Sequence, residues 1–517
     1  MNCDCGKTCA STNDSANACT AEDQAKCGCD PSNHKLTTEH TEKHRESASM
    51  NSVSSSEAGG KRRHAAPLTG ENFTATRNAC KLCAPLGACL AFRGIEGCLP
   101  FLHGSQGCAT YIRRYMISHF REPMDIASSN FGEESVVFGG RKNLSDGLTH
   151  VIESYRPKVV GIATTCLAET IGDDVGMYVK EYVSADQKKV DLPRILHAST
   201  PSYSGSHADG YQWAVRAIVD QLAVDGPNEK FIGVFPGMVS PADLRYLREI
   251  MDDFGMSHTI APDYSDPLDG PVWGDYHKIP AGGTPVREIA KLGRASAVIE
   301  LASTISDKQS AASLLDEKFS TAVFRVGLPI GIRQSDKFHK VLEQITDQPT
   351  PAKHEAERGR LVDAYVDGHK YTFGKEVIIF GEEDFVVGMT AFCAEIGLKP
   401  VLCASGGASG KLRDCVLEAA PEVAPETPIL EGVDFAEIEV ATFNLKPDLL
   451  LGNSKGFSLS RKAGIPLIRV GFPIHDRVSG PRSLHLGYRG AQRLFDTICD
   501  KLMELQQDGN DTGYTYI

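Results

Sequence analysis

The chain has 517 residues, 41% of them hydrophobic and 23% charged, which is an ordinary balance for a globular protein but too long for one hydrophobic core. Its net charge of −13 argues against a general nucleic-acid binder, because contacts to phosphates need clustered Lys and Arg. There is no run of roughly 18 apolar residues and no apolar signal-peptide core, so we expect no membrane span and a cytoplasmic location.

The beginning of the chain differs in composition from the rest. Residues 1–72 contain no aromatic residue and no Ile, and they hold six of the 16 cysteines. Such a segment buries too little apolar surface to offset the entropy cost of ordering it, which predicts a disordered, Cys-rich tail. Its CDC and CGC pairs could bind or load a metal, although an accessory tail with no fixed site is the simpler interpretation.

Strand-like apolar runs alternate with amphipathic helical stretches from Phe73 onward. Most of the runs end in Gly, Ser or Thr and lead into a helical stretch, which is typical of buried parallel strands. The repeated strand–turn–helix order predicts several doubly wound α/β domains. A strand pair is also expected at residues 466–474. The main runs are residues 158–165, 230–237, 296–302, 376–381, 399–405 and 447–454.

Two composition changes divide this part of the chain. DGPNEK precedes a strand-like run near residue 228, and GHKYTFGKE precedes another near residue 372. The Gly-rich SGGASG at 405–410 follows a strand and precedes a helix, but so short a match is more often a turn or a helix start than a phosphate loop. After the tail, the expected α/β domains are therefore residues 73–228, 229–372 and 373–517.

Three cysteines lie in different short motifs that suit turns or helix starts. Cys83 stands in CAPLGA, Cys108 in HGSQGC and Cys166 in GIATTCLAET. Each is expected at a strand or loop end, where α/β folds place ligand sites. A lone cysteine is usually a small buried hydrophobe, but three in such settings indicate distant thiolates brought together around one iron–sulfur cluster.

Three thiolates are too few for a whole cluster. Even a four-iron cluster usually takes four cysteines, so we expect another chain to complete the site at a subunit interface. Cys89 and Cys98 lie among apolar residues and are expected in the core. Cys80 forms a CxxC with Cys83, which leaves a zinc or redox pair open, but no second CxxC partners it.

Longer motifs carry a family resemblance. CAPLGA, HGSQGCATYIRRYMISHFREP, TTCLAETIGDD and TPSYSGSH are followed by ERGRLVDAYVDGHKY, DLLLGNS and PLIRVGFPIHDR. Together these motifs resemble the β-type subunits of nitrogenase component 1 and its paralogues, over roughly residues 75–510. The resemblance implies three Rossmann-like domains per subunit and an α2β2 assembly with an α-type partner.

The resemblance also implies the chemistry of the site. In β-type subunits the cysteines that match Cys83, Cys108 and Cys166 hold an iron–sulfur cluster shared with the α-type partner, either an [8Fe-7S] P-cluster-like or a [4Fe-4S] cluster. Ser202, in TPSYSGSH, matches a serine that can ligate the oxidised cluster; a turn or helix-cap role is the alternative. His103 has a counterpart beside the cluster. The active-site cofactor belongs to the partner, so no catalytic residue is expected on this chain.

The role of the whole complex has competing interpretations. The resemblance implies that an ATP-dependent iron protein delivers electrons, which are relayed to a metallocluster in the α-type partner. The segment 263–285 resembles scaffold subunits that assemble the iron–molybdenum cofactor, which predicts a scaffold role. The complete cysteine set suits the alternative, a catalytic β subunit of a nitrogenase or a nitrogenase-like reductase acting on dinitrogen or carbon–sulfur bonds. A non-redox structural subunit with incidental thiols is a third interpretation.

Overall fold

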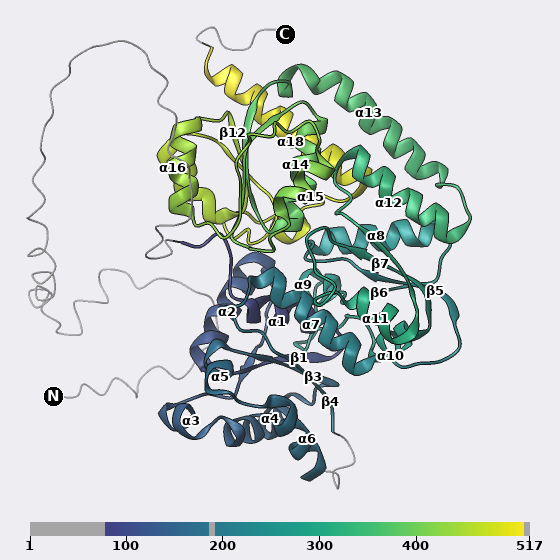
Figure 1. Cartoon of the computed structure of the whole chain (residues 1–517), viewed down its shortest axis with the longest axis vertical. Helices are drawn as coiled ribbons and strands as arrows, with labels where there is room; N and C mark the ends of the chain where they lie inside the picture. The colour runs from purple at the N-terminus through teal and green to yellow at the C-terminus, as the bar shows by residue number, and fades with distance from the viewer. Residues whose placement is uncertain (1–77, 186–191, 511–517) are drawn as a thin grey trace, which may run out of the picture. The chain divides into compact units, whose positions relative to one another are not determined.

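The computed structural model describes residues 78–185 and 192–510, which belong to one compact unit running from Phe73 to Ile517. The predicted tail at 1–72 lies outside the described residues. Three parallel sheets with helices between their strands make up this unit, which confirms the predicted doubly wound α/β fold (Figure 1). None of the described helices is both long and apolar enough to cross a membrane.

The first sheet is drawn in blue in Figure 1. Its strands are β1 (Cys98–His103), β2 (Ala127–Ser128), β3 (Val159–Thr164) and β4 (Arg194–Ala198). Its helices are α1 (Ala84–Arg93), α2 (Gln106–Phe120), α3 (Glu133–Phe138), α4 (Arg141–Tyr155), α5 (Cys166–Ile171), α6 (Val175–Ala185) and α7 (His207–Leu222). The strands run parallel in the order β2-β1-β3-β4. Phe101 and Ile162 join the apolar cluster of α4 and α6, whereas Leu102 and Ala163 join that of α1 and α7. This burial on both faces explains the continuous apolar runs.

Strand β1 is absent from the predicted set of strands, and Pro100 within it gives a reason. Proline has no N–H to donate and usually argues against a central strand. It is tolerated here because β2 pairs only with Phe101 and Leu102, so no ladder bond to Pro100 is needed on that side. The carboxyl ends of β1 and β3 therefore lie side by side, with His103 opposite Thr164.

The second sheet follows in the teal part of the chain and has the order β6-β5-β7-β8, again fully parallel. Its strands are β5 (Glu229–Phe235), β6 (His258–Ile260), β7 (Ala295–Leu301) and β8 (Ala322–Val326). The helices in this stretch of the chain are α8 (Pro241–Asp253), α9 (Ser265–Asp269), α10 (Val286–Lys291), η4 (Leu292–Arg294), α11 (Ala311–Phe319), α12 (Gly331–Thr346) and α13 (Ala352–Thr372). The last two, α12 and α13, pack mainly on helices of the third-sheet region. The predicted runs 230–237 and 296–302 match β5 and β7 to within two residues.

The third sheet has the parallel order β11-β10-β9-β12-β13. Its strands are β9 (Glu376–Gly381), β10 (Lys399–Ser405), β11 (Ile429–Leu430), β12 (Leu449–Gly452) and β13 (Leu467–Arg469). Its helices are α14 (Glu383–Glu395), α15 (Leu412–Ala419), α16 (Phe435–Leu445), η5 (Ser454–Gly456), α17 (Phe457–Ala463), η6 (Gly480–Arg482) and α18 (Gly487–Asp508). The predicted strand pair at 466–474 is wrong. Only β13 forms there, because the chain turns at Gly471, which has a φ of 70°, and continues into Pro473, which has no N–H to pair.

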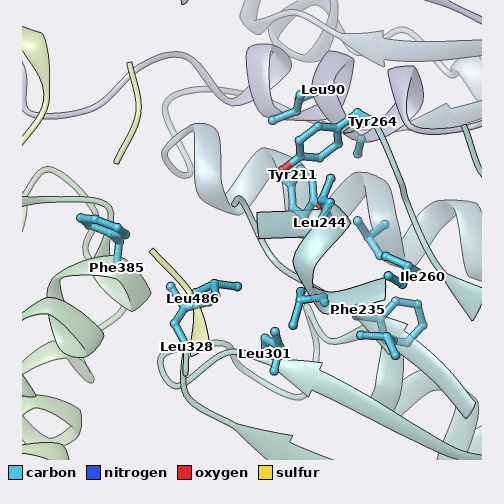
Figure 2. Close-up of a cluster of buried hydrophobic side chains, with 14 of the residues drawn as sticks. Leu90, Tyr211, Phe235, Leu244, Ile260, Tyr264, Leu301, Leu328, Phe385 and Leu486 are labelled. Atoms are coloured by element: carbon cyan, nitrogen blue, oxygen red, sulfur yellow. The ribbon is translucent and has the colours of Figure 1, made fainter. Parts of the chain in front are cut away.

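One large apolar core joins the three sheets. Figure 2 shows part of it, where Leu90 of α1, Leu244 of α8 and Phe385 of α14 belong to one continuous cluster. The predicted boundaries near 228 and 372 do fall between sheets, since β5 begins at Glu229 and α13 ends at Thr372. Because the core is shared, the division into separate domains stays a prediction.

The SGGASG segment forms the turn between β10 and α15. A Cβ on Gly406 would lie 2.4 Å from the carbonyl carbon of Cys80. Glycine is therefore needed for the backbone at Cys80 to come so close to this turn. The N–H of Ser409 donates to the carboxylate of Glu383 at 3.2 Å. The carboxyl group of Glu383 therefore takes a donor that a phosphate loop would offer to its ligand, in agreement with the expected turn.

Candidate cluster-binding site

Cys83 precedes a helix whose residues are all buried. It is the N-cap residue of α1, with extended backbone, and its side chain is exposed. Helix α1 packs backbone against backbone on α7, because a Cβ on Gly87 would lie 1.7 Å from the carbonyl oxygen of His207. A Cβ on Gly210 would lie 1.9 Å from the carbonyl oxygen of Ala84. The glycine of CAPLGA thus sets the position from which Cys83 projects.

Cys108 lies in the first turn of α2 and is exposed. The helix begins at Gln106, because Ser105 caps it by accepting the N–H of Gly107 at 3.2 Å. Gly104 lets this loop lie against the end of β3, since a Cβ there would be 2.1 Å from the Thr165 hydroxyl. The same hydroxyl donates to the carbonyl of His103 at 3.1 Å. These contacts hold the loop before Cys108 beside the residue that precedes Cys166.

Cys166 is the first residue of α5, directly after β3 and its Thr165 N-cap. The N–H of Ser202 donates to the Sγ of Cys166 at 3.2 Å, while the Oγ of Ser202 accepts the N–H of Ala84 at 3.1 Å. Ser202 therefore connects the cysteine at the end of β3 with the helix that follows Cys83. Its hydroxyl satisfies the first free N–H of α1, which is the helix-cap role left open by the sequence.

The three thiols are close enough to influence one another electrostatically. Burial raises the pKa of Cys108, and the charges of Cys83 and Cys166 raise this pKa further. Thiolates that influence one another in this way repel, so a bound cation would favour their deprotonated form. Among the residues that the structure describes, no three His, Cys, Asp or Glu side chains converge on the position of a single metal ion.

Two residues outside the predicted set contact the backbone beside Cys83. The Nζ of Lys455 donates to the carbonyls of Ala79 and Lys81, and its charge lies near Cys83. The Nδ1 of His207 accepts the N–H of Leu82 at 3.3 Å. Burial lowers the pKa of His207 to about 3, so its imidazole is neutral. Lys455 follows the motif DLLLGNS directly, but nothing local to that motif indicates that it reaches the first cysteine.

His103 lies at the end of β1 and is fully buried. Its Nε2 lies 2.9 Å from a carboxylate oxygen of Asp173, whose other contacts include the N–H of Gly140. Burial lowers the pKa of His103, and the hydrogen bond to Asp173 opposes that effect. The pair fixes the loop after α5 to the end of β1. His103 therefore connects the segment that follows Cys166 with the segment that precedes Cys108.

The remaining predicted cysteines lie in the core. Cys80, Cys89 and Cys98 are at most 3% exposed. Burial raises the pKa of Cys80 to about 12 and that of Cys98 to about 12, so both are neutral thiols. This agrees with the expected core positions of Cys89 and Cys98 and places Cys80 among the apolar side chains of the third sheet.

The cavity between the three sheets is small. It is lined by Leu90, His119, Phe385 and Leu486 among others and measures about 30 Å³, which is room for one or two water molecules. Figure 2 shows Leu90, Phe385 and Leu486 around this region. This cavity has no space for a metal cluster, whereas the exposed end of the first sheet carries the three thiols.

The model of the family described as nitrogenase component 1 type oxidoreductase matches residues 83–503, so the match opens at Cys83. The chain belongs to this family, as a β-type subunit.

Relatives in the nitrogenase component 1 family align over most of the chain. It is 34% identical over 434 residues to the nitrogenase molybdenum-iron protein beta chain of Clostridium pasteurianum, which covers 83% of this chain and 93% of that one. It is 36% identical over 452 residues to the corresponding beta chain of Methanococcus maripaludis, covering 84% and 96%. The solved structure titled "Nitrogenase Cp1 at pH 6.5" is similar with a TM-score of 0.83 at 32% identity, covering 87% and 98%.

Proposed function

We propose that this chain is the electron-relay β-type subunit of a catalytic component 1 complex, and that it shares an iron–sulfur cluster with an α-type partner. The observation that carries the proposal is the arrangement of Cys83, Cys108 and Cys166 at one end of the first sheet. Two of the three thiols are exposed and the third is partly so, and they come from the ends of three different helices.

The residues present fit such a cluster. Thiolates are the usual iron–sulfur ligands, and the fourth and further thiolates would come from the partner. The Ser202 N–H stabilises a thiolate on Cys166, and the Lys455 ammonium partly neutralises the negative charge near Cys83. When bound, the cluster supplies one-electron transfer. The protein's part is to hold the three sulfurs on a rigid sheet end and to bury them in an interface.

The α-type partner is expected to cover the face beside Cys83. A surface groove of about 520 Å³ runs along α16 and contains Phe435, Val440, Phe443 and Lys455. Val440 and Phe443 are exposed apolar side chains, and Lys455 connects the groove with the backbone next to Cys83. Exposed apolar surface of this kind marks an interaction site.

The iron protein is expected to dock near α3. Phe138 is 84% exposed and the neighbouring Val137 is 73% exposed. Gly140, the residue before α4, donates its N–H to Asp173, which in turn contacts His103 at the end of β1. Two exposed apolar side chains near the end of the first sheet that carries the cysteines are a suitable docking site for an electron-donor protein.

A catalytic role and a cofactor-assembly scaffold role make different predictions for the complex. The full cysteine set and the beta chains of molybdenum-iron proteins among its relatives support a catalytic subunit. The scaffold role predicted from segment 263–285 stays a second candidate. This chain, co-expressed with an α-type partner, should form a complex that reduces dinitrogen or a carbon–sulfur compound when an iron protein and ATP are added. Failure to turn over any substrate, with loss of cofactor synthesis in a deletion strain, would instead support the scaffold.

The cluster itself is tested by Cys108→Ala in the co-purified complex. Loss of a ligand should remove much of the cluster's iron and its EPR signal and should slow electron transfer strongly, because metal binding is coupled to the order of the site. Cys499→Ala, which changes a buried thiol of α18, is the control and should keep the iron content. Equal iron content and activity in both variants would contradict the relay function.

A further inference from the structure

A second cavity lies away from the cysteines, at the carboxyl ends of β7 and β8. It measures about 270 Å³ and is formed by the ends of these two strands, the start of α12, and the sides of α14 and α15. Ligand sites in parallel α/β sheets occupy this position, outside the carboxyl ends of the strands. The volume is just below that of pockets for drug-sized molecules, so the cavity suits a smaller metabolite.

Hydrogen bonds from backbone N–H groups to two carboxylates hold the walls of this cavity in place. Glu395 accepts the N–H of Ile332 at 2.7 Å and that of Arg333 at 2.9 Å, which locks the first turn of α12. Asp384 accepts the N–H of Ser303 at 2.6 Å and so fixes the loop after β7. The cavity is therefore preformed and needs no rearrangement to receive a ligand.

Gln334 is the unusual residue of this cavity. It is only 6% exposed, lines the cavity, and makes no side-chain hydrogen bond to any residue that the structure describes. Its Oε1 lies 3.7 Å from the position that a Cβ on Gly327 would take, so the amide faces the floor formed by the end of β8. Neither polar atom of this amide is among the fully buried, unpaired atoms of the described residues, so water reaches it from the cavity, and a ligand with matching polar groups would replace that water.

Two charged side chains at the cavity also lack a partner in the described part of the chain. Lys337 lies one turn after Gln334 on α12, and Glu418 lies opposite on α15; both are exposed. The guanidinium of Arg325, by contrast, is already bonded to Glu300 and Asp307. Among the described residues, the cavity lining thus offers one cation, one anion and one amide that no other side chain pairs with.

We propose that this cavity binds a small zwitterion of the amino-acid class. The carboxylate of the ligand pairs with Lys337, its ammonium pairs with Glu418, and its polar atoms bond to the Gln334 amide. The apolar lining from Val326, Leu328 and other residues contacts the body of the ligand. A simple anion would leave Glu418 facing like charge, which is why the zwitterion fits better.

The first experiment measures binding to the intact complex with its α-type partner. Each soluble proteinogenic L-amino acid is titrated by calorimetry, and at least one should bind saturably. The N-acetyl and the amide derivatives of that amino acid should each bind about tenfold more weakly, since each lacks one ion pair. Absence of saturable binding by every amino acid would overturn the proposal, as would equal binding of succinate, which would indicate an anion site.

Variants assign each contact to a ligand group. Lys337→Met should weaken the free amino acid but not its amide, and Glu418→Gln should weaken the free amino acid but not its N-acetyl form. Lys340→Met, on the same helix but outside the cavity, is the charge-matched control and should bind normally. Binding that survives both cavity variants would overturn the proposal.

Gln334→Leu separates a ligand contact from a structural one. It should weaken binding about tenfold or more, yet the unliganded complex should melt at about the same temperature, because the amide makes no hydrogen bond within the described part of the chain. A lower melting temperature without ligand would show that Gln334 serves the fold and would overturn its assigned role.

Discussion

At the scale of single residues, the loops that carry the cysteines depend on a few hydrogen bonds from neighbouring side chains and backbone groups. Ser202 bonds to both Cys166 and the start of α1, and the two bonds use different atoms. The bond to Cys166 comes from the backbone N–H and survives any change of side chain. The bond to Ala84 comes from the hydroxyl alone, so a substitution can separate the two roles.

Ser202→Ala should lower the stability of the complex by about 1 kcal/mol, because the first N–H of α1 loses its cap. Thermal unfolding of the co-purified complex measures this loss. Ser202→Thr keeps the hydroxyl and should recover most of it. If the hydroxyl also ligates the oxidised cluster, the EPR spectrum of the oxidised form will change in Ser202→Ala; an unchanged spectrum will leave only the cap role.

Glu383 gives a pH dependence that can be tested. Burial raises the pKa of this carboxyl from 4.5 to about 7 in the folded protein. Between these values the folded state binds a proton that the unfolded state has released, so the free energy of unfolding falls as the pH rises from 4.5 to 7 and then levels off.

Glu383→Gln should remove this fall and make the complex about 1–3 kcal/mol more stable than the parent at pH 8. The measurement is the difference in unfolding free energy between variant and parent from pH 5 to 8. The exposed Glu426→Gln is the control and should follow the parent curve. A variant less stable than the parent at pH 8 would show that the charged form of Glu383 is needed.

At the scale of elements, helix α1 can place Cys83 only because it touches the backbone of α7. Gly87→Ala would put a methyl group 1.7 Å from the carbonyl oxygen of His207, and a backbone atom cannot move aside as a flexible side chain can. The two helices would have to separate, and Cys83 would move with α1.

We expect Gly87→Ala to lose more than about 3 kcal/mol of stability and most of the bound iron. Gly359→Ala makes the same chemical change in the interior of α13, where a Cβ meets no atom within 4 Å. It should stabilise by about 0.5–1 kcal/mol, since alanine favours helix over glycine. Melting temperature and iron content report both effects, and similar values for the two variants would refute the close-packing explanation.

At the scale of the whole molecule, the third sheet reaches back to the first cysteine through Lys455. Its ammonium holds the backbone carbonyls of Ala79 and Lys81 and brings a positive charge near Cys83. Lys455→Met removes both, so a bound cluster should become harder to reduce, because a nearby positive charge favours the added electron.

An EPR-monitored redox titration of the complex measures this shift. Lys455→Met should move the potential to more negative values, and Lys455→Arg should restore most of it because the charge is kept. Lys462→Met, in the same groove but exposed and paired with Glu439, is the control. Equal potentials in Lys455→Met and Lys462→Met would mean that the ammonium is only structural.

The sequence by itself determined the α/β class and the parallel strands, and it predicted a site at the three cysteines, because continuous apolar runs and turn residues next to thiols are local patterns with local causes. It did not reveal β1, where Pro100 is tolerated only because β2 is short, and it overstated the strand at 466–474, which Gly471 ends. The roles of Ser202, His207 and Lys455 were decided by the tertiary structure. Each bonds to backbone more than 100 residues away, and no pattern along the chain encodes such a contact.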